Sequence, residues 1–157
     1  GDDYAQPIVL SDNLLFAGFY SKPGGIAKVD LTNFEQVASL HFSEQEDNVW
    51  SLILHQGFLY AGLDTRPGAI VRLDHDLKRL ETLRLDIEGG VYAFVILNDS
   101  LICGVYSSPG KIVVIRLKER PSEATSVLFV AVPIMSILIP VTILIVKFRP
   151  RPRYVID

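Results

Sequence analysis

The side chains best suited to binding a metal in this sequence are the consecutive residues Asp74, His75 and Asp76. Carboxylate and imidazole groups are common metal ligands. Successive residues of a strand point to opposite faces, however, so these three side chains cannot simply converge on one ion. We therefore interpret the group as an ordinary solvated turn and expect no metal site there.

The single cysteine and the other two histidines form no recognised catalytic arrangement. Cys103 occupies the same position of an internal repeat as Ala17 and Ala61, which indicates a small buried residue rather than a reactive thiol. His41 and His55 have no second histidine at metal-ligand spacing. The sequence also lacks a phosphate-binding glycine loop, a nucleophile elbow and zinc-ligand spacing. We therefore assign no catalytic residue, no cofactor and no metal site.

The acidic stretch SEQEDN, residues 43–48, could hold calcium or a basic partner if it lies in a ligand-binding loop. The simpler interpretation, which we adopt, is a solvated connection between two repeats. Basic residues gather only in the C-terminal tail, so the sequence gives no support for nucleic-acid binding.

Asn98-Asp99-Ser100 is an acceptor sequence for N-glycosylation. It falls in a predicted hairpin turn, where it would be accessible on the outer surface of a eukaryotic cell. Asn98 is therefore a candidate glycosylation site.

These residues lie within a threefold internal repeat. Residues 5–31, 49–75 and 91–117 align without a gap over 27 positions, at offsets of 44 and 42 residues. A period in the low forties with turn signals is typical of propeller blades rather than helical repeats. The columns filled identically in all three copies are Leu15, Leu59 and Leu101; Gly18, Gly62 and Gly104; Pro23-Gly24, Pro67-Gly68 and Pro109-Gly110; and Ile26, Ile70 and Ile112.

Each copy divides into strands and turns. A short apolar run predicts a buried first strand, and the polar residues after it predict a hairpin turn. The second strand has the repeated glycine in its middle, which indicates a bulge or a close approach of another backbone. The Pro-Gly pair predicts a second turn, in which proline sets φ and glycine takes a positive φ. An alternating third strand follows, and then a fourth strand at residues 34–42 and 77–85.

Four antiparallel strands in about 43 residues make one blade of a propeller, so we expect an all-β chain with blades at residues 5–48, 49–90 and 91–117. The third copy lacks a fourth strand, and we expect a strand from the beginning of the full chain to complete it. Closed propellers need roughly four to eight blades, so we also expect the native ectodomain to extend upstream of Gly1.

Trp50 shares its repeat column with Tyr92 and Gln6. An aromatic side chain in this column could line a binding surface. We expect it instead to pack between neighbouring blades.

The segment LYAGLDTRPGAIVRLD at residues 59–74, followed by the amphipathic LKRLETLRL at 77–85, resembles the repeat of YVTN-type and related propellers. Such repeats occur in surface proteins of bacteria and of single-celled eukaryotes. The resemblance covers residues 5–117 and implies the propeller fold. It implies either a binding scaffold or a lactonase-like enzyme, because fold does not determine function. No catalytic residue of the enzymatic relatives can be placed in this sequence.

Residues 126–146, SVLFVAVPIMSILIPVTILIV, contain no charged side chain over 21 positions. A helix of this length, at ~1.5 Å per residue, crosses the ~30 Å hydrocarbon layer of a bilayer. Four basic residues and one acid follow the segment, whereas basic and acidic residues balance before it. The flank richer in Lys and Arg stays in the cytoplasm, so we expect the N-terminal region to lie outside the cell or in an organelle lumen.

These features predict a single-pass membrane protein. Its parts are a partial propeller ectodomain at 1–120, a stalk at 121–125, a transmembrane helix at 126–146 and a basic cytoplasmic tail at 147–157. The expected partners are the lipid bilayer and an unknown protein or carbohydrate, bound at the cell surface in ligand recognition or adhesion. The alternative is a membrane-tethered enzyme of the lactonase-like hydrolase type.

Overall fold

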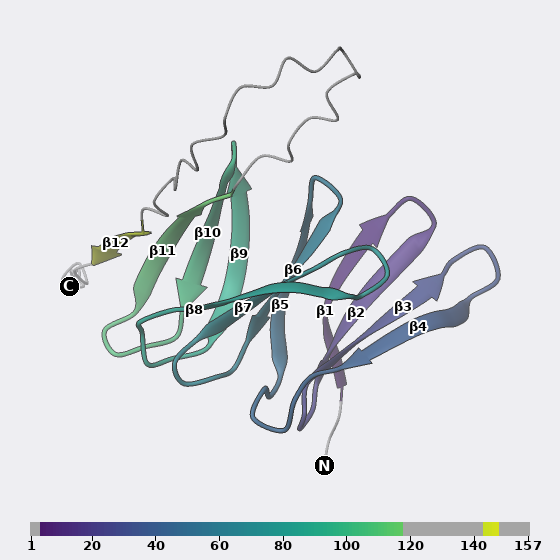
Figure 1. Cartoon of the computed structure of the whole chain (residues 1–157), viewed down its shortest axis with the longest axis horizontal. Coiled ribbons are helices and arrows are strands. Elements are labelled where there is room, and N and C mark those ends of the chain that lie inside the picture. The colour runs from purple at the N-terminus through teal and green to yellow at the C-terminus, as the bar shows by residue number, and fades with distance from the viewer. Residues whose placement is uncertain (1–3, 118–142, 148–157) are drawn as a thin grey trace, which may run out of the picture.

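The computed structural model describes residues 4–117 and 143–147, which form three four-stranded antiparallel sheets (Figure 1). We call these sheets blades 1, 2 and 3. Blade 1 contains β1 (Tyr4–Ser11), β2 (Leu14–Tyr20), β3 (Gly25–Asp30) and β4 (Glu35–His41). Blade 2 contains β5 (Val49–His55), β6 (Phe58–Leu63), β7 (Ala69–Leu73) and β8 (Arg79–Arg84). Blade 3 contains β9 (Val91–Leu97), β10 (Ser100–Val105), β11 (Lys111–Arg116) and β12 (Ile143–Lys147).

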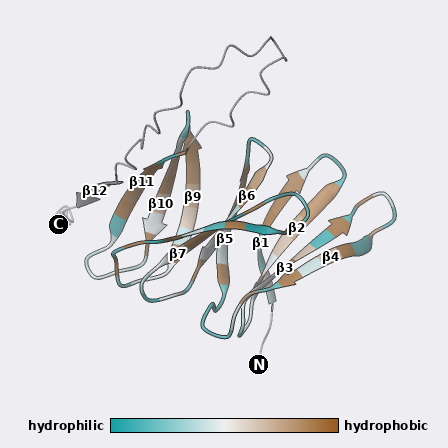
Figure 2. Ribbon diagram, viewed as in Figure 1, coloured by the Kyte–Doolittle hydropathy of each residue, from teal (hydrophilic) through white to brown (hydrophobic). Residues whose placement is uncertain are grey.

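The hairpin turns that join the first two strands of each blade lie where the repeat predicts them. Asp12, Gln56 and Asn98 adopt left-handed backbone conformations in these turns, with φ of 51°, 48° and 52°. The Asp and Asn side chains at two of these positions tolerate this conformation better than most other residues. Figure 2 shows the resulting pattern, with apolar residues along the strands and polar residues at the connections.

The Pro-Gly pairs lie in the connections from the second to the third strand of each blade, and all three prolines follow a cis peptide bond. The expectation that their glycines take positive φ is wrong, because Gly24, Gly68 and Gly110 do not. At Gly24 and Gly68 the constraint is space. A Cβ on Gly24 would lie 3.0 Å from the backbone nitrogen of Asn48, and one on Gly68 would overlap the carbonyl oxygen of Gly89.

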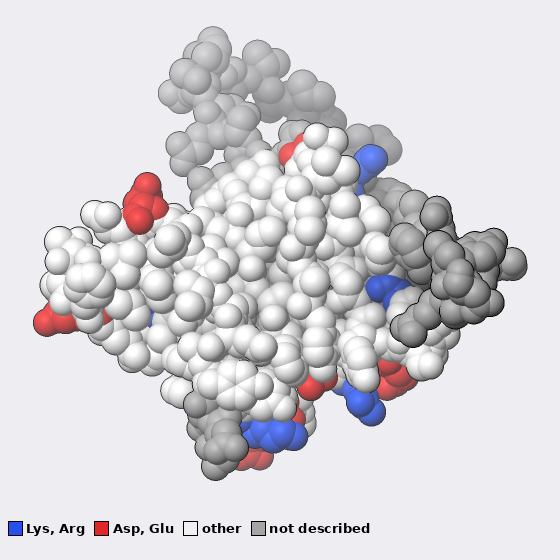
Figure 3. Space-filling view, turned by 180° about the vertical axis from the view of Figure 1, so that it is seen from behind, with Lys and Arg blue, Asp and Glu red and all other residues white. Residues whose placement is uncertain are grey.

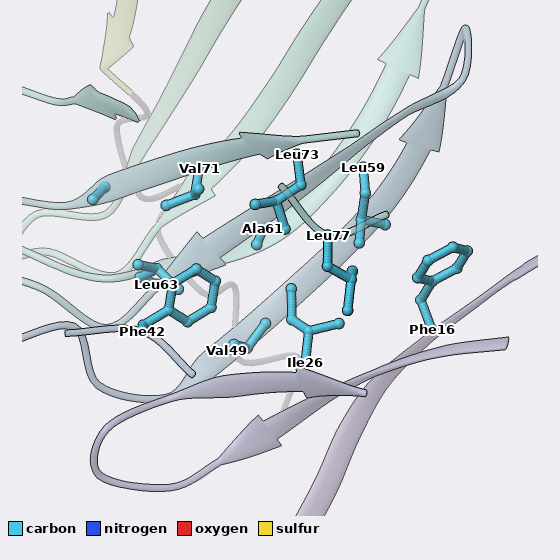
Figure 4. Close-up of a cluster of buried hydrophobic side chains, with 11 residues drawn as sticks. Phe16, Ile26, Phe42, Val49, Leu59, Ala61, Leu63, Val71, Leu73 and Leu77 are labelled. Atoms are coloured by element: carbon cyan, nitrogen blue, oxygen red, sulfur yellow. The ribbon is translucent and has the colours of Figure 1, made fainter. Parts of the chain in front are cut away.

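Blades 1 and 2 pack face to face through a continuous apolar core. Phe16 and Ile26 of blade 1 meet Leu59, Val71 and other side chains of blade 2 (Figure 4). A second core joins blade 2 to blade 3 in the same way. The first strands of the blades lie side by side, because β5 contacts both β1 and β9. Burying apolar side chains between sheets is the main force that holds such an array together.

In blades 1 and 2 the glycine in the middle of the second strand lets the next blade approach closely, at the position where the sequence predicted a bulge or a close backbone approach. A Cβ on Gly18 would lie 2.6 Å from Cγ1 of Val49 in the next blade. A Cβ on Gly62 would lie 2.6 Å from the carbonyl oxygen of Val91 in the blade after it. The third member, Gly104, faces only Ala93 of its own blade, at 3.4 Å.

Blade 3 obtains its fourth strand from the C-terminal part of the chain. β12 pairs antiparallel with β11, from Lys111–Lys147 to Ile115–Ile143. This position was expected to be filled by a strand from the beginning of the chain, and β12 occupies it instead.

The predicted transmembrane helix falls almost entirely outside the described residues. Its last four residues, 143–146, belong to β12 and form a strand rather than the end of a helix. Within residues 4–117 and 143–147, no helix is long and apolar enough to cross a membrane. The predicted stalk and most of the basic tail also lie outside the described part of the chain.

Candidate ligand-binding surface

One end of the three blades carries all of the Pro-Gly connections, and we call this end the Pro-Gly face. The antiparallel register places the beginning of each first strand beside the end of the second, for example Tyr4 opposite Tyr20. The connections from blade 1 to blade 2 and from blade 2 to blade 3 reach the same end. Backbone from all three blades therefore meets on this face.

The same hydrogen bond holds each Pro-Gly connection. The hydroxyl groups of Ser21, Thr65 and Ser107 each donate to the carbonyl oxygen of the proline two residues later, at 2.8 Å in every case. The proline carbonyl lies in a loop and has no strand partner, so the hydroxyl group supplies the hydrogen bond that a neighbouring strand would otherwise give. The repeat produces three connections of one design.

Backbone hydrogen bonds tie these connections to the segments that lead into the next blade. The amide of Gly24 donates to the carbonyl of Glu46 at 2.8 Å, and the amide of Gly68 donates to the carbonyl of Ile87 at 3.0 Å. A third bond, from the amide of Asn48 to the carbonyl of Ser21 at 3.0 Å, links the same segment to blade 1. The Pro-Gly face is therefore a bonded surface rather than a set of independent loops.

An aromatic row crosses this face, and we define it as Tyr4, Tyr20, Trp50, Tyr92 and Tyr106. Tyr4 stacks on Tyr20 with ring centroids 4.7 Å apart, and the rings of Tyr20 and Trp50 pack edge to face with centroids 5.1 Å apart. Trp50 stacks on Tyr92 at 4.4 Å, and Tyr92 lies 5.2 Å from Tyr106. These separations are within the range of favourable ring pairs.

Two repeat columns supply most of this row. One contains Gln6, Trp50 and Tyr92 at the beginning of the first strands, and the other contains Tyr20, Asp64 and Tyr106 at the end of the second strands. The stack of Trp50 on Tyr92 joins blade 2 to blade 3, which agrees with the expected packing role of this column. The role of the second column was not predicted from the sequence. The recurrence of tyrosine in two of the three copies was a signal that this column matters. Its contact with the first column could not be predicted, because that contact depends on how neighbouring blades are placed.

Charged residues lie next to the aromatic row. Lys22 pairs with Asp47 at 3.0 Å. The hydrogen bond to Asp47, together with its charge, raises the pKa of Lys22. Partial burial raises the pKa of Tyr92, and the nearby Asp64 carboxylate adds to the shift while Arg66 opposes it. Both residues thus keep their usual protonation state at neutral pH.

The acidic stretch 43–48 is not simply solvated, which corrects the interpretation adopted from the sequence. Glu46 is buried, at 2% exposure, and its carboxylate accepts hydrogen bonds from the two terminal guanidinium nitrogens of Arg79 at 3.1 and 2.7 Å. Ser43 also donates its amide and hydroxyl to Glu46. Burial alone would raise the pKa of Glu46, but these hydrogen bonds outweigh it and the pKa is lowered. Glu46 therefore joins blade 1 to blade 2.

The other residues considered for chemistry have structural positions. Asp74 accepts hydrogen bonds from the amides of Asp76 and Lys78 in a turn, and the ring of His75 meets Phe16 edge-on at 5.8 Å. Cys103 is fully buried, as expected, and burial raises its pKa to about 12. Within residues 4–117 and 143–147, no cluster of three or more His, Cys, Asp or Glu side chains could hold a metal ion. Asn98 lies exposed in its hairpin turn.

A pocket lies between blades 2 and 3, away from the aromatic row, and both polar and apolar side chains line it. Tyr60, Leu101 and Ile115 form part of its wall. Arg72 also lines it and lies 3.6 Å from Glu81 and 5.0 Å from the ring centre of Phe58. Burial raises the pKa of Tyr60, so this phenol stays neutral. The ion pair and the ring contact of Arg72 both lie within blade 2, and residues of blade 3 form the other wall, so we regard this pocket as part of the packing between blades.

Solved structures with the same arrangement identify the sheets. A chain in the crystal structure of the mitotic checkpoint complex matches with 18% identity and a TM-score of 0.57, over 71% of this chain and 35% of that chain. The β-propeller domain of Myceliophteria thermophila Cps50 (Swd1) matches with 14% identity and a TM-score of 0.54, over 73% and 36% of the two chains. The three sheets are β-propeller blades. Quinohemoprotein alcohol dehydrogenase from Comamonas testosteroni matches the propeller segment with 14% identity and a TM-score of 0.58, over 72% and 19%.

This propeller segment spans about a third or less of each of those three chains. At 14–18% identity, the likeness establishes the fold and leaves function open. No protein-family model and no curated protein matches the sequence.

Proposed function

We propose that this chain is a binding module that receives a protein or carbohydrate ligand on its Pro-Gly face, in ligand recognition or adhesion. The observation that carries the proposal is the aromatic row, which runs across three blades with charged residues beside it. Tyr and Trp combine a large apolar area with a polar tip, and both are enriched at binding interfaces. A ligand that presents both apolar surface and hydrogen-bonding groups suits this combination.

The solved propellers give this proposal limited but relevant support. One similar structure is a chain of an assembly named the mitotic checkpoint complex, so the same fold occurs in a protein that assembles with others. The proposed repeat type is the YVTN type, because the Gly, Pro-Gly and alternating columns recur in all three blades.

The titratable groups on the Pro-Gly face favour binding over acid–base catalysis. A general acid or base works best with a pKa near the working pH. The pKa values of Tyr92 and Lys22 are both raised, from ordinary values that already lie well above neutral pH. The pKa of Glu46 is lowered, and its carboxylate is occupied by Arg79. The lactonase-like alternative gains no support from these groups.

The charge distribution argues against a nucleic-acid partner. Nucleic-acid binding needs basic side chains gathered on one face. On the face shown in Figure 3, Lys and Arg are few and lie at the margins together with Asp and Glu. At the Pro-Gly face, Lys22 is paired with an acid.

We further propose that residues 126–146 anchor the module in a bilayer, with the propeller outside the cell or in an organelle lumen and the tail in the cytoplasm. The support is the charge-free stretch of 21 residues and the basic residues after it. This arrangement requires residues 143–146 to leave β11 when the chain is in the membrane, because a strand cannot pair with blade 3 and cross the bilayer at once.

Trp50 provides a direct test of ligand binding, because it is the only tryptophan in the chain and lies in the aromatic row. The chain is screened against an oligosaccharide panel and a displayed random-peptide library. Each selected sugar or peptide is then titrated while the fluorescence of Trp50 is recorded. We expect saturable changes in emission, and we expect Arg66→Ala and Tyr92→Ala to weaken binding at least several-fold.

Lys78→Ala is the matched control, because Lys78 is an exposed cation at the opposite end of blade 2. It is expected to leave the binding curve unchanged. Ligands that bind the Tyr92→Ala and Arg66→Ala variants as tightly as the original chain would place recognition elsewhere and reject the Pro-Gly face.

A further inference from the structure

The pocket between blades 2 and 3 has a counterpart between blades 1 and 2, where the structure shows what fills it. We call the contact of blades 1 and 2 the first junction and that of blades 2 and 3 the second junction. The buried lining of the pocket, each residue 6% exposed or less, consists of Tyr60, Ile70, Leu101 and Ile115. The residues in the same repeat columns at the first junction are Phe16, Ile26, Leu59 and Leu73. All of these belong to the core of the first junction, so the same four columns meet at both junctions.

At the first junction these columns surround Leu77. Leu77 comes from the turn between β7 and β8 and is 4% exposed. Figure 4 shows its side chain among Ile26, Leu59 and Phe16, in the same core. The preceding residue, Asp76, accepts a hydrogen bond from the ammonium group of Lys28 at 3.3 Å. A branched apolar chain beside a carboxylate therefore completes the first junction.

The third copy of the repeat does not contain this pair of side chains. Arg72, which lines the pocket, is the counterpart of Lys28, so the second junction keeps the cation. At the repeat offset of 42 residues, the counterparts of Asp76 and Leu77 are Lys118 and Glu119, which lie outside the described residues. In the sequence a lysine thus replaces the acid, and a glutamate replaces the leucine.

The polar side chains that line the pocket favour an anion. They are two cations, Arg72 and Arg116, and one acid, Glu81. Arg116 is exposed and occupies the column of Asp74, so the charge in this column is reversed between blades 2 and 3. Opposite charges across a contact favour the matching partner and disfavour one of the same sign. The second junction is therefore suited to a carboxylate.

The guanidinium group of Arg72 has a donor to spare. Its Nε is buried and has no hydrogen-bond partner in the described part of the chain. Its terminal nitrogen lies 3.6 Å from Glu81, which is too long for a good hydrogen bond. A guanidinium group can donate from two nitrogens to the two oxygens of one carboxylate. Arg72 could therefore hold an incoming carboxylate more closely than it holds Glu81.

The size of the pocket limits the apolar part of a ligand. Its volume is about 80 Å³, whereas pockets for drug-sized ligands have roughly 300–1,000 Å³. This space suits a chain of a few carbon atoms, such as the side chain of a leucine.

We propose that the pocket at the second junction binds a carboxylic acid that carries a short branched apolar chain. The chain lies among Tyr60, Ile70 and Leu101, and the carboxylate binds Arg72. Free branched-chain acids and the C-terminal leucine of a peptide both present this chemistry. The pocket is separate from the Pro-Gly face, so the inference does not depend on the ligand of that face.

Methyl NMR of the full-length chain, labelled at isoleucine and held in a non-ionic detergent, tests the site. The two probes are isocaproate, a free acid, and acetyl-leucine, which represents a C-terminal leucine. We expect saturable shifts of the Ile70 and Ile115 methyl signals with both. Ile26 is the internal control and should not shift, because Leu77 already packs in its column at the first junction. Isocaproamide and acetyl-leucine amide lack the charge and should bind at least several-fold more weakly.

Three variants test the role of Arg72. Arg72→Gln is expected to weaken the binding of both acids at least several-fold and to leave that of the amides nearly unchanged. Glu81→Gln should strengthen the binding of both acids, because it removes a carboxylate that competes for Arg72. The side chain of Glu81 is 60% exposed, so this variant should keep the fold. Lys28→Gln is the matched control at the first junction and should leave the affinities unchanged.

The order of the two affinities identifies the source of the ligand. Tighter binding of acetyl-leucine would indicate a C-terminal leucine, tighter binding of isocaproate would indicate a free acid, and either order supports the site. Unshifted Ile70 and Ile115 signals with both acids would overturn the proposal. Equal affinities for acids and amides would also overturn it, as would affinities that neither Arg72→Gln nor Glu81→Gln changes, because Arg72 would then not bind the carboxylate.

Discussion

Glu46 illustrates how one side chain can join two blades. It comes from the connection after β4, yet its carboxylate is buried against Arg79 at the beginning of β8. Arg79 in turn lies 5.3 Å from the ring centre of Phe42. Removing one partner of a buried ion pair is costly because the other charge remains without compensation. The sequence could not reveal this pair, since Glu46 and Arg79 are 33 positions apart and neither recurs in the repeat.

The Glu46–Arg79 pair makes stability dependent on pH. Hydrogen bonds lower the pKa of Glu46 in the folded chain below the ordinary value of 4.5. The pair therefore stabilises the fold above that pH, and the contribution is lost as the pH falls through the folded-state pKa. We expect Glu46→Gln to lower the free energy of unfolding by about 1.5–3 kcal/mol at neutral pH and by progressively less in acid. Urea unfolding measured across this pH range checks the difference.

Glu81→Gln is the control for this measurement. The side chain of Glu81 is 60% exposed and lies 3.6 Å from Arg72, so its removal should change the free energy of unfolding by less than about 1 kcal/mol. Parallel pH profiles for the original chain and Glu46→Gln would contradict the assigned role of Glu46.

The glycines of the Pro-Gly pairs provide a second comparison at this scale. We expect Gly68→Ala to lower the free energy of unfolding by about 1–3 kcal/mol, because its Cβ would overlap the carbonyl oxygen of Gly89. Gly110→Ala should change it by no more than about 0.5 kcal/mol, because its Cβ would meet nothing nearer than the Ser107 carbonyl at 4.0 Å. Chemical denaturation of both variants measures the difference, and equal losses would contradict the explanation from space.

At the scale of elements, most strands could be predicted because the pattern of the first three strands recurs in all three copies of the repeat. The apolar first strand, the glycine of the second strand and the alternating third strand each recur, and a repeated pattern is hard to produce by chance. The backbone of the Pro-Gly connections was predicted incorrectly, because steric crowding by the next connection, and not positive φ, restricts Gly24 and Gly68. β12 could not be predicted, since residues 143–146 also read as part of a membrane span.

The two possible positions of residues 143–146 can be separated by experiment. We expect the full chain to remain with the membrane after carbonate extraction. Ile134→Lys combined with Leu138→Lys should release it, because each lysine near the middle of a span costs about 2.5–3.5 kcal/mol. Leu80→Lys, on the surface of blade 2, is the control and should have no effect. Retention of the double variant would show that the segment is no transmembrane anchor.

At the scale of the whole molecule, the sequence predicted blades but not the surface that they build together. The aromatic row depends on contacts between Tyr20 and Trp50 and between Trp50 and Tyr92, each of which crosses from one blade to the next. Such contacts follow from the angle between sheets, which no single repeat encodes. The predicted packing role of Trp50 and its place on a candidate binding surface are therefore compatible.

The orientation of the molecule in a membrane can be tested through Asn98. When the chain is produced in eukaryotic cells, we expect one glycan on Asn98, because its exposed turn would face the lumen during synthesis. Treatment with an N-glycosidase should increase electrophoretic mobility, and Asn98→Gln should abolish this change. Ser100→Thr preserves the acceptor sequence and should retain it. Modification of an acceptor engineered into the C-terminal tail, with Asn98 unmodified, would reverse the assigned topology.

The bare position at each second-strand glycine has an evolutionary consequence. Gly18 and Gly62 each leave space that a valine of the next blade fills. Each repeat of about 43 residues therefore carries both the glycine that accepts the following blade and the side chain that fits against the preceding blade. A tandem duplication of this stretch would therefore create a new joint whose two halves already match. Genes encoding such arrays can lengthen or shorten by whole units, and point mutations need only tune the fit afterwards.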